Sequence, residues 1–369
     1  MKKIGCIIIA AVLISSLSAC KSNEIVNNIS SDTVTTSSEI IPQESEVSSI
    51  EEQTSSVESV VSEPIISKPP TTSSKPVQPT PPPAPPVQTP PVTNEPATIS
   101  YTPKVVSPGN TYTGLPVLEP KQYIINDISN SRGLSTVRNG FSFGVAKNGA
   151  PHSITVNNQN TFDGYNLNTL AWDNKTPEKI LYLTFDCGYK YLDLTDRLLD
   201  TLKEKNVKAA FFCTLDYLED DPNAVCRMIS EGHIVGNHST THPDFSKISR
   251  AKIAEEVLGA NNFLRVNYGY ESPYFRFPSG AYTHSALDVV YQTGHRSIFW
   301  SVAYADWDPN NQIGTEKAFE QVTSRLHPGA VILLHSTSPD NVQILSRVID
   351  YALSQGYQFR SLDQYAYWN

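Results

Sequence analysis

Short apolar runs alternate with longer stretches of helical periodicity from residue 179 to the end of the chain. The runs are KILYLTF, KAAFFCT, HIVGN, YFRF, RSIFWSV, GAVILLH and YQFRSL. Between them lie segments such as LTDRLLDTLKEKN, SRAKIAEEVLGANNFLRV and TEKAFEQVTSRL, in which apolar residues recur with helical spacing. Strands that alternate with helices in this way predict an α/β fold with a parallel sheet, most simply closed into a barrel.

The pattern weakens upstream of this region. Residues 101–176 are rich in Asn, Gly, Ser and Thr and alternate only weakly, as in VRNGFSFGV. We expect loops and short strands there, forming a pre-domain that wraps a main domain at residues 177–369. Residues 21–100 contain no aromatic residue and no cysteine, and they end in a proline-rich run. This composition predicts a disordered stalk, with a ligand for a proline-binding module as the alternative.

Residues 1–20, MKKIGCIIIAAVLISSLSAC, pair two lysines with a short apolar run that ends in small residues. The run is too short for a membrane span and is typical of a secretory signal. LSAC also resembles the bacterial lipobox, in which Cys20 is acylated, while a plain signal peptide that contains a cysteine is the alternative. We therefore expect a lipid-anchored protein on the outer face of the cell membrane.

The formal net charge of −9 argues against nucleic acid as a partner, because phosphate binding needs a basic face. Much of the negative charge lies in the stalk, so it says little about the folded part. We expect the protein to be a monomer.

Ionisable residues stand at or just after the carboxyl ends of successive predicted strands. In a parallel barrel these ends meet at one mouth, where catalytic groups gather. The residues are Asp186, His238, Arg276, Asp306 and His335.

His238 and His242 are four residues apart in GNHSTTH, a spacing that places two imidazoles on one face and suits a divalent metal. Taken alone, the pair would more often be two ordinary surface or core histidines. Its position after a strand, together with the other strand-end groups, favours the metal interpretation.

Asp186 follows the apolar run LYLTF, so burial would raise its pKa and Arg276 would restrain that rise. Such a carboxylate beside a metal-bound water can act as a general base, whereas a helix cap is the structural alternative. His335 is a candidate general acid whose second ring nitrogen Asp306 would hold. A lone histidine at a strand end is more often a hydrogen-bonded core residue.

Five motifs, TFDCGY, HSTTH, RFPSG, ADWD and LLH, resemble in order and separation those of the polysaccharide deacetylases, carbohydrate esterase family four. Within that family, EGHIVGNHS, HPDFS, FWSVAYADW and S-x-DN are most similar to the delta-lactam-forming muramic-acid de-N-acetylases of spore-forming bacteria. The resemblance implies a distorted (β/α) barrel of about seven strands, a divalent metal, and hydrolysis of an N-acetyl group on a glycan.

By motif, the resemblance assigns Asp186 as base, Arg276 as its partner, and His335 as acid with Asp306 behind it. His238 and His242 become metal ligands. It also implies that the backbone N–H of Ser279 stabilises the oxyanion and that Trp307 and Leu333 line the acetyl pocket.

Cys187 departs from the family pattern, which has a second, metal-binding aspartate at this position. A thiolate would complete an open three-ligand zinc site with His238 and His242, so zinc is favoured and magnesium or manganese are the alternatives. The sequence is equally consistent with a Cys187 that packs in the core or that, like an asparagine, contacts the ligands without binding the metal. We expect Cys213 and Cys226 to be buried thiols.

The sequence thus predicts a metal-dependent peptidoglycan N-deacetylase with muramic acid as its preferred target. One alternative acts on N-acetylglucosamine in peptidoglycan or chitin-like oligomers. A second alternative is a glycan-binding pseudoenzyme, against which the full set of strand-end ionisable residues argues.

Overall fold

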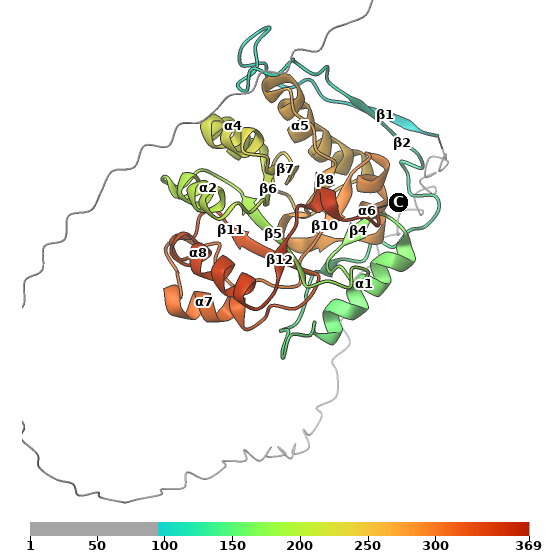
Figure 1. Cartoon of the computed structure of the whole chain (residues 1–369). Helices are drawn as coiled ribbons and strands as arrows, with labels where there is room; N and C mark the ends of the chain where they lie inside the picture. Colours follow the sequence, from blue (N-terminus) through green and yellow to red (C-terminus); the bar gives the residue numbers. More distant parts are fainter. Residues whose placement is uncertain (1–94, 369) are drawn as a thin grey trace, which may run out of the picture. The chain divides into compact units, whose positions relative to one another are not determined.

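The computed structural model describes residues 95–368 (Figure 1). The predicted signal peptide at residues 1–20, Cys20 included, lies outside the described residues, as does the predicted stalk up to residue 94. The first described strand, β1 (Ala97–Ser100), pairs antiparallel with β2 (Gln122–Ile125), and both strands pack against helix α5 (Arg250–Tyr268). Regular structure is therefore already present at residues that the composition assigned to the stalk.

The central sheet follows the order β11-β5-β6-β7-β8-β10-β4, and β12 adds to β5. All of these neighbours pair in parallel. Bridges from Val302 to Ile332 and from Trp172 to Ala330 join the far side of the sheet back to β11. The predicted α/β barrel of about seven parallel strands is thus confirmed. Its strands are β4 (Thr169–Leu170), β5 (Ile180–Cys187), β6 (Ala210–Cys213), β7 (Ile234–Asn237), β8 (Tyr274–Phe275), β10 (Arg296–Ile298), β11 (Ala330–His335) and β12 (Gln358–Phe359).

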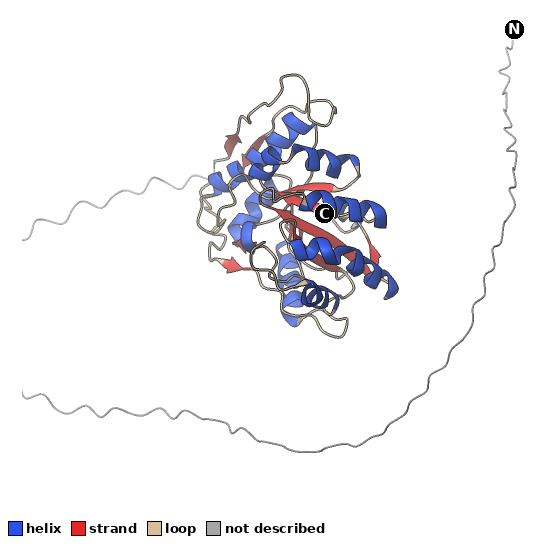
Figure 2. Ribbon diagram, turned by 90° about the vertical axis from the view of Figure 1, so that its left-hand side faces the viewer, coloured by secondary structure: helices blue, strands red, loops and turns tan. Residues whose placement is uncertain are grey.

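Helices surround the strands on the outside of the barrel (Figure 2). Helix α8 is typical of them: Ile344, Leu345, Val348 and Ile349 recur at helical spacing and are buried against the sheet and α2. Ser338 caps its first turn by accepting a hydrogen bond from the Asn341 N–H. The other helices of this layer are α2 (Leu194–Lys205), α3 (Leu215–Asp220), α4 (Pro222–Ser230), α6 (His284–Gln292) and α7 (Thr315–Thr323), while α8 spans Pro339–Ser354.

Side chains along β5 alternate between the two sides of the sheet. Leu183, Phe185 and Cys187 belong to the apolar cluster that contains α2, α4 and α8, whereas Tyr182 belongs to the other cluster. Both sides are apolar because a parallel strand is covered on its two faces. The alternation continues to the end of the strand, so that Asp186 and Cys187 point to opposite sides.

The segment before residue 177 contributes to the main body. Strand β4 pairs with β10, and the short strand β3 (Asn139–Gly140) pairs with β9 (Ala281–Tyr282). Helix α1 (Ser153–Tyr165) was not expected, because its Asn and Thr residues favour helices poorly. Tertiary contacts hold it instead: Gln159 is buried and its Oε1 accepts from the N–H groups of Ala171 and Trp172.

No helix within residues 95–368 is long and apolar enough to cross a membrane.

Three buried histidines predict a loss of stability in mild acid. Burial lowers the pKa of His233, His295 and His327 from 6.5 to about 4, and within residues 95–368 their Nε2 atoms have no hydrogen-bond partner. The unfolded chain binds protons at these sites that the folded chain does not, so the free energy of unfolding should fall as pH drops from about 6.5 to about 4. Urea titrations over this range measure the slope. His327→Gln should flatten it, and an unchanged slope in that variant would contradict the explanation.

Candidate active site

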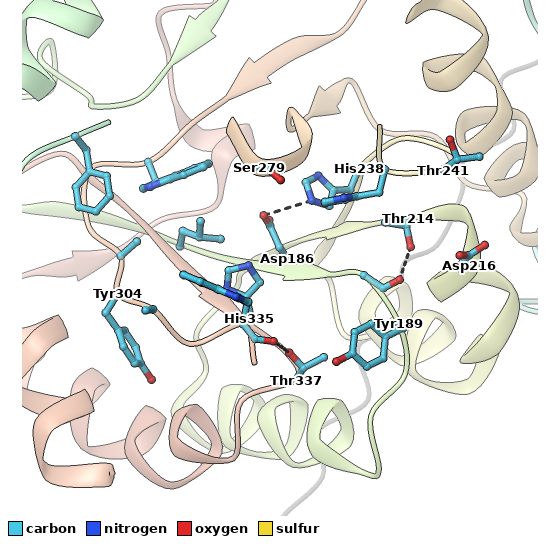
Figure 3. A pocket seen from close by; sticks show the side chains of 18 of the residues that line it. Asp186, Tyr189, Thr214, Asp216, His238, Thr241, Ser279, Tyr304, His335 and Thr337 are labelled. Carbon is cyan, nitrogen blue, oxygen red and sulfur yellow. Dashed lines mark hydrogen bonds and ion pairs between the residues drawn. The ribbon is translucent and has the colours of Figure 1, made fainter. Parts of the chain in front are cut away.

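A cavity of about 810 Å³ opens at the carboxyl ends of the barrel strands (Figure 3). It collects most of the residues that the sequence singled out, from five separate stretches of the chain. Those that line it are Asp186, His238, His242, Ser279, Trp307, Leu333 and His335. Arg276 and Asp306 do not line the cavity but bind residues that do.

A buried ion pair fixes Asp186. Arg276 has no exposed surface, and its Nη1 donates to Asp186 Oδ1 at 2.8 Å. Its other N–H groups donate to Thr184 Oγ1 and to the carbonyls of residues 298 and 299, while the guanidinium carbon lies 4.2 Å from the ring centroid of Phe212. Burial by itself raises the pKa of Asp186, but the charge of Arg276, helped by two nearby histidines, holds that pKa below its usual range. The carboxyl group is therefore an ionised, oriented proton acceptor.

His238 and His242 bring two imidazoles together beside this carboxylate. His238 Nδ1 donates to the carbonyl of Arg276 at 2.9 Å, which leaves Nε2 facing Asp186 Oδ2 at 3.5 Å. The two rings lie 4.9 Å apart between centroids. They are brought together by a loop with left-handed backbone at Ser239 and His242.

Both imidazoles are in the state that binds a cation. Burial lowers the pKa of His238 to about 4 and also lowers the pKa of His242, so both rings are neutral near pH 7. Within residues 95–368, no three His, Cys, Asp or Glu side chains are arranged to hold a metal ion. The donors that the described part of the chain offers a divalent cation are therefore the two neutral imidazoles of His238 and His242.

Cys187 does not join that pair, contrary to the three-ligand set that the sequence suggested. Its side chain is buried in the apolar cluster on the helix side of the sheet, where it interacts with the neighbouring thiol of Cys213. It does not line the cavity. The reason is the strand alternation, which turns Cys187 outward because Asp186 points inward. Cys213 and Cys226 are both free thiols, as expected, but only Cys213 is buried, whereas Cys226 is half-buried.

His335 is held from behind by Asp306. Its Nδ1 donates to Asp306 Oδ1 at 2.7 Å, and its backbone N–H donates to Oδ2 at 2.8 Å. Burial lowers the pKa of His335, but the carboxylate outweighs it, so the pKa is raised overall. The ring therefore carries a proton to higher pH than an ordinary histidine.

Asn341 completes this arrangement, and the sequence reasoning gave it no role although it belongs to the S-x-DN motif. Its Nδ2 donates to Asp306 Oδ2 at 2.6 Å and to the His335 carbonyl at 3.0 Å. Its Oδ1 accepts from Tyr304 at 2.6 Å. The carboxylate of Asp306 is thus bonded on both oxygens and keeps a fixed orientation toward His335.

The three residues assigned to substrate contacts differ in their surroundings. Ser279 has a left-handed φ of 53° and is exposed to the cavity, next to Gly280 with φ of 62°. A Cβ on Gly280 would lie 2.9 Å from Phe141 and Trp300, so the turn that presents Ser279 requires this glycine. Leu333 is buried, but Trp307 is 61% exposed and therefore lies on the rim of the cavity. The oxyanion role of the Ser279 N–H stays a prediction.

The cavity has further lining residues to which the sequence analysis assigned no role. Tyr189, Thr214, Asp216 and Thr241 form a polar side, and Tyr304 lies beyond His335 on the opposite side (Figure 3). Phe143, Trp300, Ala303 and Arg325 also line it. Tyr189, Thr241, Trp300, Ala303 and Tyr304 lie inside the motifs TFDCGY, HSTTH and FWSVAYADW, although the sequence alone gave them no role. No motif contains Phe143, Thr214, Asp216 or Arg325, whose positions in the cavity depend on segments that are distant along the chain. Chemically, the site can place an amide between the Asp186 carboxylate and a protonated His335.

The sequence profile of the family described as polysaccharide deacetylase matches residues 173–298. The peptidoglycan-N-acetylmuramic acid deacetylase PdaA of Bacillus subtilis is 37% identical over 216 residues, which cover 57% of this chain and 82% of that protein. A peptidoglycan-N-acetylglucosamine deacetylase of Bacillus cereus is 32% identical over 49% of this chain and 66% of its own length. The solved structure of B. subtilis PdaA, a family 4 carbohydrate esterase, matches with a TM-score of 0.58 and 34% identity, covering 62% of this chain and 97% of that one. The chain belongs to the polysaccharide deacetylase family.

Proposed function

We propose that this polysaccharide deacetylase hydrolyses the N-acetyl group of muramic acid residues in peptidoglycan. The observation that carries the proposal is the pairing of two oriented groups in one cavity, Asp186 held by Arg276 and His335 held by Asp306. The two side chains stand on neighbouring strands at directly paired positions. Similarity to a named N-acetylmuramic acid deacetylase over 82% of its length supports the target.

Asp186 is the general base in this mechanism. It accepts a proton from the water that attacks the acetyl carbonyl, and Arg276 keeps it ionised and pointed into the cavity. His335 then donates its proton to the departing nitrogen as the C–N bond breaks, so acetate and a free amine leave. The Ser279 N–H faces the developing oxyanion. Asp186 thus gains one proton and His335 loses one, so the two transfers balance.

His238 and His242 are the proposed metal ligands. A bound divalent cation supplies Lewis acidity toward the carbonyl and a lower pKa for water. Imidazole ligands favour zinc over magnesium or manganese, which prefer oxygen. This preference rests on the two histidines and no longer on Cys187.

We also propose a lipid anchor at Cys20 and a monomeric, extracytoplasmic enzyme. The signal-like residues 1–20 and the lipobox-like LSAC support the anchor. A peptidoglycan substrate supports the location, since the glycan strands lie outside the cell membrane.

The proposal is tested by incubating the full chain with peptidoglycan, before and after amidase removal of its peptides, with zinc, magnesium or manganese. Mass spectrometry should show acetate and a new amine on the muramic residue, and Asp186→Asn should lower the rate by at least about 10²-fold because the base is lost. Deacetylation of glucosamine residues alone would favour the alternative that the B. cereus relative exemplifies. If no acetate is released under any condition, the glycan-binding pseudoenzyme is the interpretation that remains.

The carboxylate behind His335 should set the alkaline limit of activity. Asp306 raises the pKa of His335, so Asp306→Asn should lower it and shift the loss of kcat/KM on the alkaline side to lower pH. NMR titration of the His335 ring gives the same shift without turnover. An alkaline limb that keeps its position in this variant would contradict the acid role.

Cys187 should be indifferent to metal. Because its thiol lies on the helix side of the sheet, Cys187→Ala should leave zinc affinity and metal preference unchanged in calorimetric titrations. His242→Ala, the matched change on the cavity side, should weaken zinc binding by roughly 10-fold or more. A comparable loss in both variants would restore Cys187 as a ligand.

A further inference from the structure

One cation in the cavity wall is not used by the mechanism. Arg325 follows helix α7, is half-buried, and is the one lysine or arginine that lines the cavity within residues 95–368. Its Nη1 donates to the carbonyl of Ala303 at 2.6 Å, and its Nη2 donates to Gln321. These bonds hold the guanidinium beside the segment that carries Tyr304 and Trp307.

Arg325 has no carboxylate partner in the described part of the chain. No Asp or Glu within residues 95–368 forms an ion pair with it, although Arg276 is neutralised by Asp186. A guanidinium has five N–H donors, and the two bonds to Ala303 and Gln321 leave others open. Partial burial without a counter-charge lowers the pKa of Arg325, the direction expected for a cation that lacks its anion.

The charge on the opposite wall gives the cavity a polarity. Asp216 is exposed at the start of α3 and lines the cavity together with Tyr189 and Thr241. In Figure 3 Asp216 lies on one side of Asp186 and Tyr304 on the other, and Arg325 is bonded next to Tyr304, at Ala303. An anionic group on a bound glycan is therefore repelled from the wall with Asp216 and attracted to the wall with Arg325.

The geometry points to Arg325 as the subsite for a carboxylate of the substrate, and hence as a determinant of specificity. This inference rests on the proposed function. A planar guanidinium fixed at two points is suited to bind a carboxylate through paired N–H donors. Muramic acid carries such a group on its lactyl ether and N-acetylglucosamine does not, while a stem peptide offers carboxylates of its own. The open donors of Arg325 thus distinguish an anionic sugar from a neutral one.

The test compares Arg325→Gln with the parent full chain on three substrates: peptide-stripped strands with free lactyl carboxylates, strands that keep their peptides, and N-acetylglucosamine oligomers. The ratio of kcat/KM for stripped strands to that for the neutral oligomers should fall roughly 10- to 100-fold, mainly through KM. Arg325→Lys should recover part of the ratio, because lysine supplies the positive charge but not the paired N–H donors of a guanidinium. Arg197→Gln, which removes an exposed arginine on α2, is the matched control and should leave the ratio unchanged.

The comparison of the three substrates identifies the source of the carboxylate. Selective loss on stripped strands assigns the lactyl group, and selective loss only on peptide-bearing strands assigns the peptide. An equal loss on all three substrates would mean that Arg325 merely positions residues 303–307, and no loss would mean that it binds nothing. Either result overturns the inference.

A binding measurement keeps the inference separate from the proposed function. If the parent chain releases no acetate, calorimetry with N-acetylmuramic acid and N-acetylglucosamine still compares the two ligands. A preference for the acid that disappears in Arg325→Gln supports the subsite even then. Equal binding of both sugars by the parent chain rejects it.

Discussion

The buried ion pair between Arg276 and Asp186 is the interaction on which the site depends. Removing both charges from water costs several kcal/mol per ion, and only a fully bonded geometry offsets that cost. Arg276 achieves this by reaching Thr184 and Asp186 on β5 and the carbonyls of residues 298 and 299 at the end of β10. The same bonds that hold the carboxylate ionised also tie β8 to two other strands, so the chemistry and the closure of the barrel share one set of contacts.

Strand register is the second constraint. The parallel pairing of β5 with β11 places His335 directly beside Asp186, which brings the proposed base and acid to one mouth although they stand 149 positions apart in the sequence (335 − 186). The alternation that points Asp186 inward also turns Cys187 toward the helices. A change of one residue in register would exchange these sides and remove the carboxylate from the cavity.

The walls of the cavity have a different origin from its floor. The floor is made of strand ends, whose positions the sheet fixes, whereas Phe143, Asp216 and Arg325 come from loops and helix ends. Loops on a rigid scaffold can change without loss of the fold, so this is where one deacetylase can differ from another in its substrate. The catalytic groups define the reaction, and the walls define which sugar reaches them.

The sequence by itself determined the fold class and the strand-end residues, because apolar periodicity and order along the chain are local properties. It identified Asp186, His238 and His335 by their positions after apolar runs. It did not reveal helix α1, which long-range bonds to Gln159 hold against weak local propensity. Only the tertiary structure decided that Cys187 faces away from the histidines and that Arg325 reaches the cavity. Both depend on the direction of a side chain relative to segments far away in sequence, which no local pattern encodes.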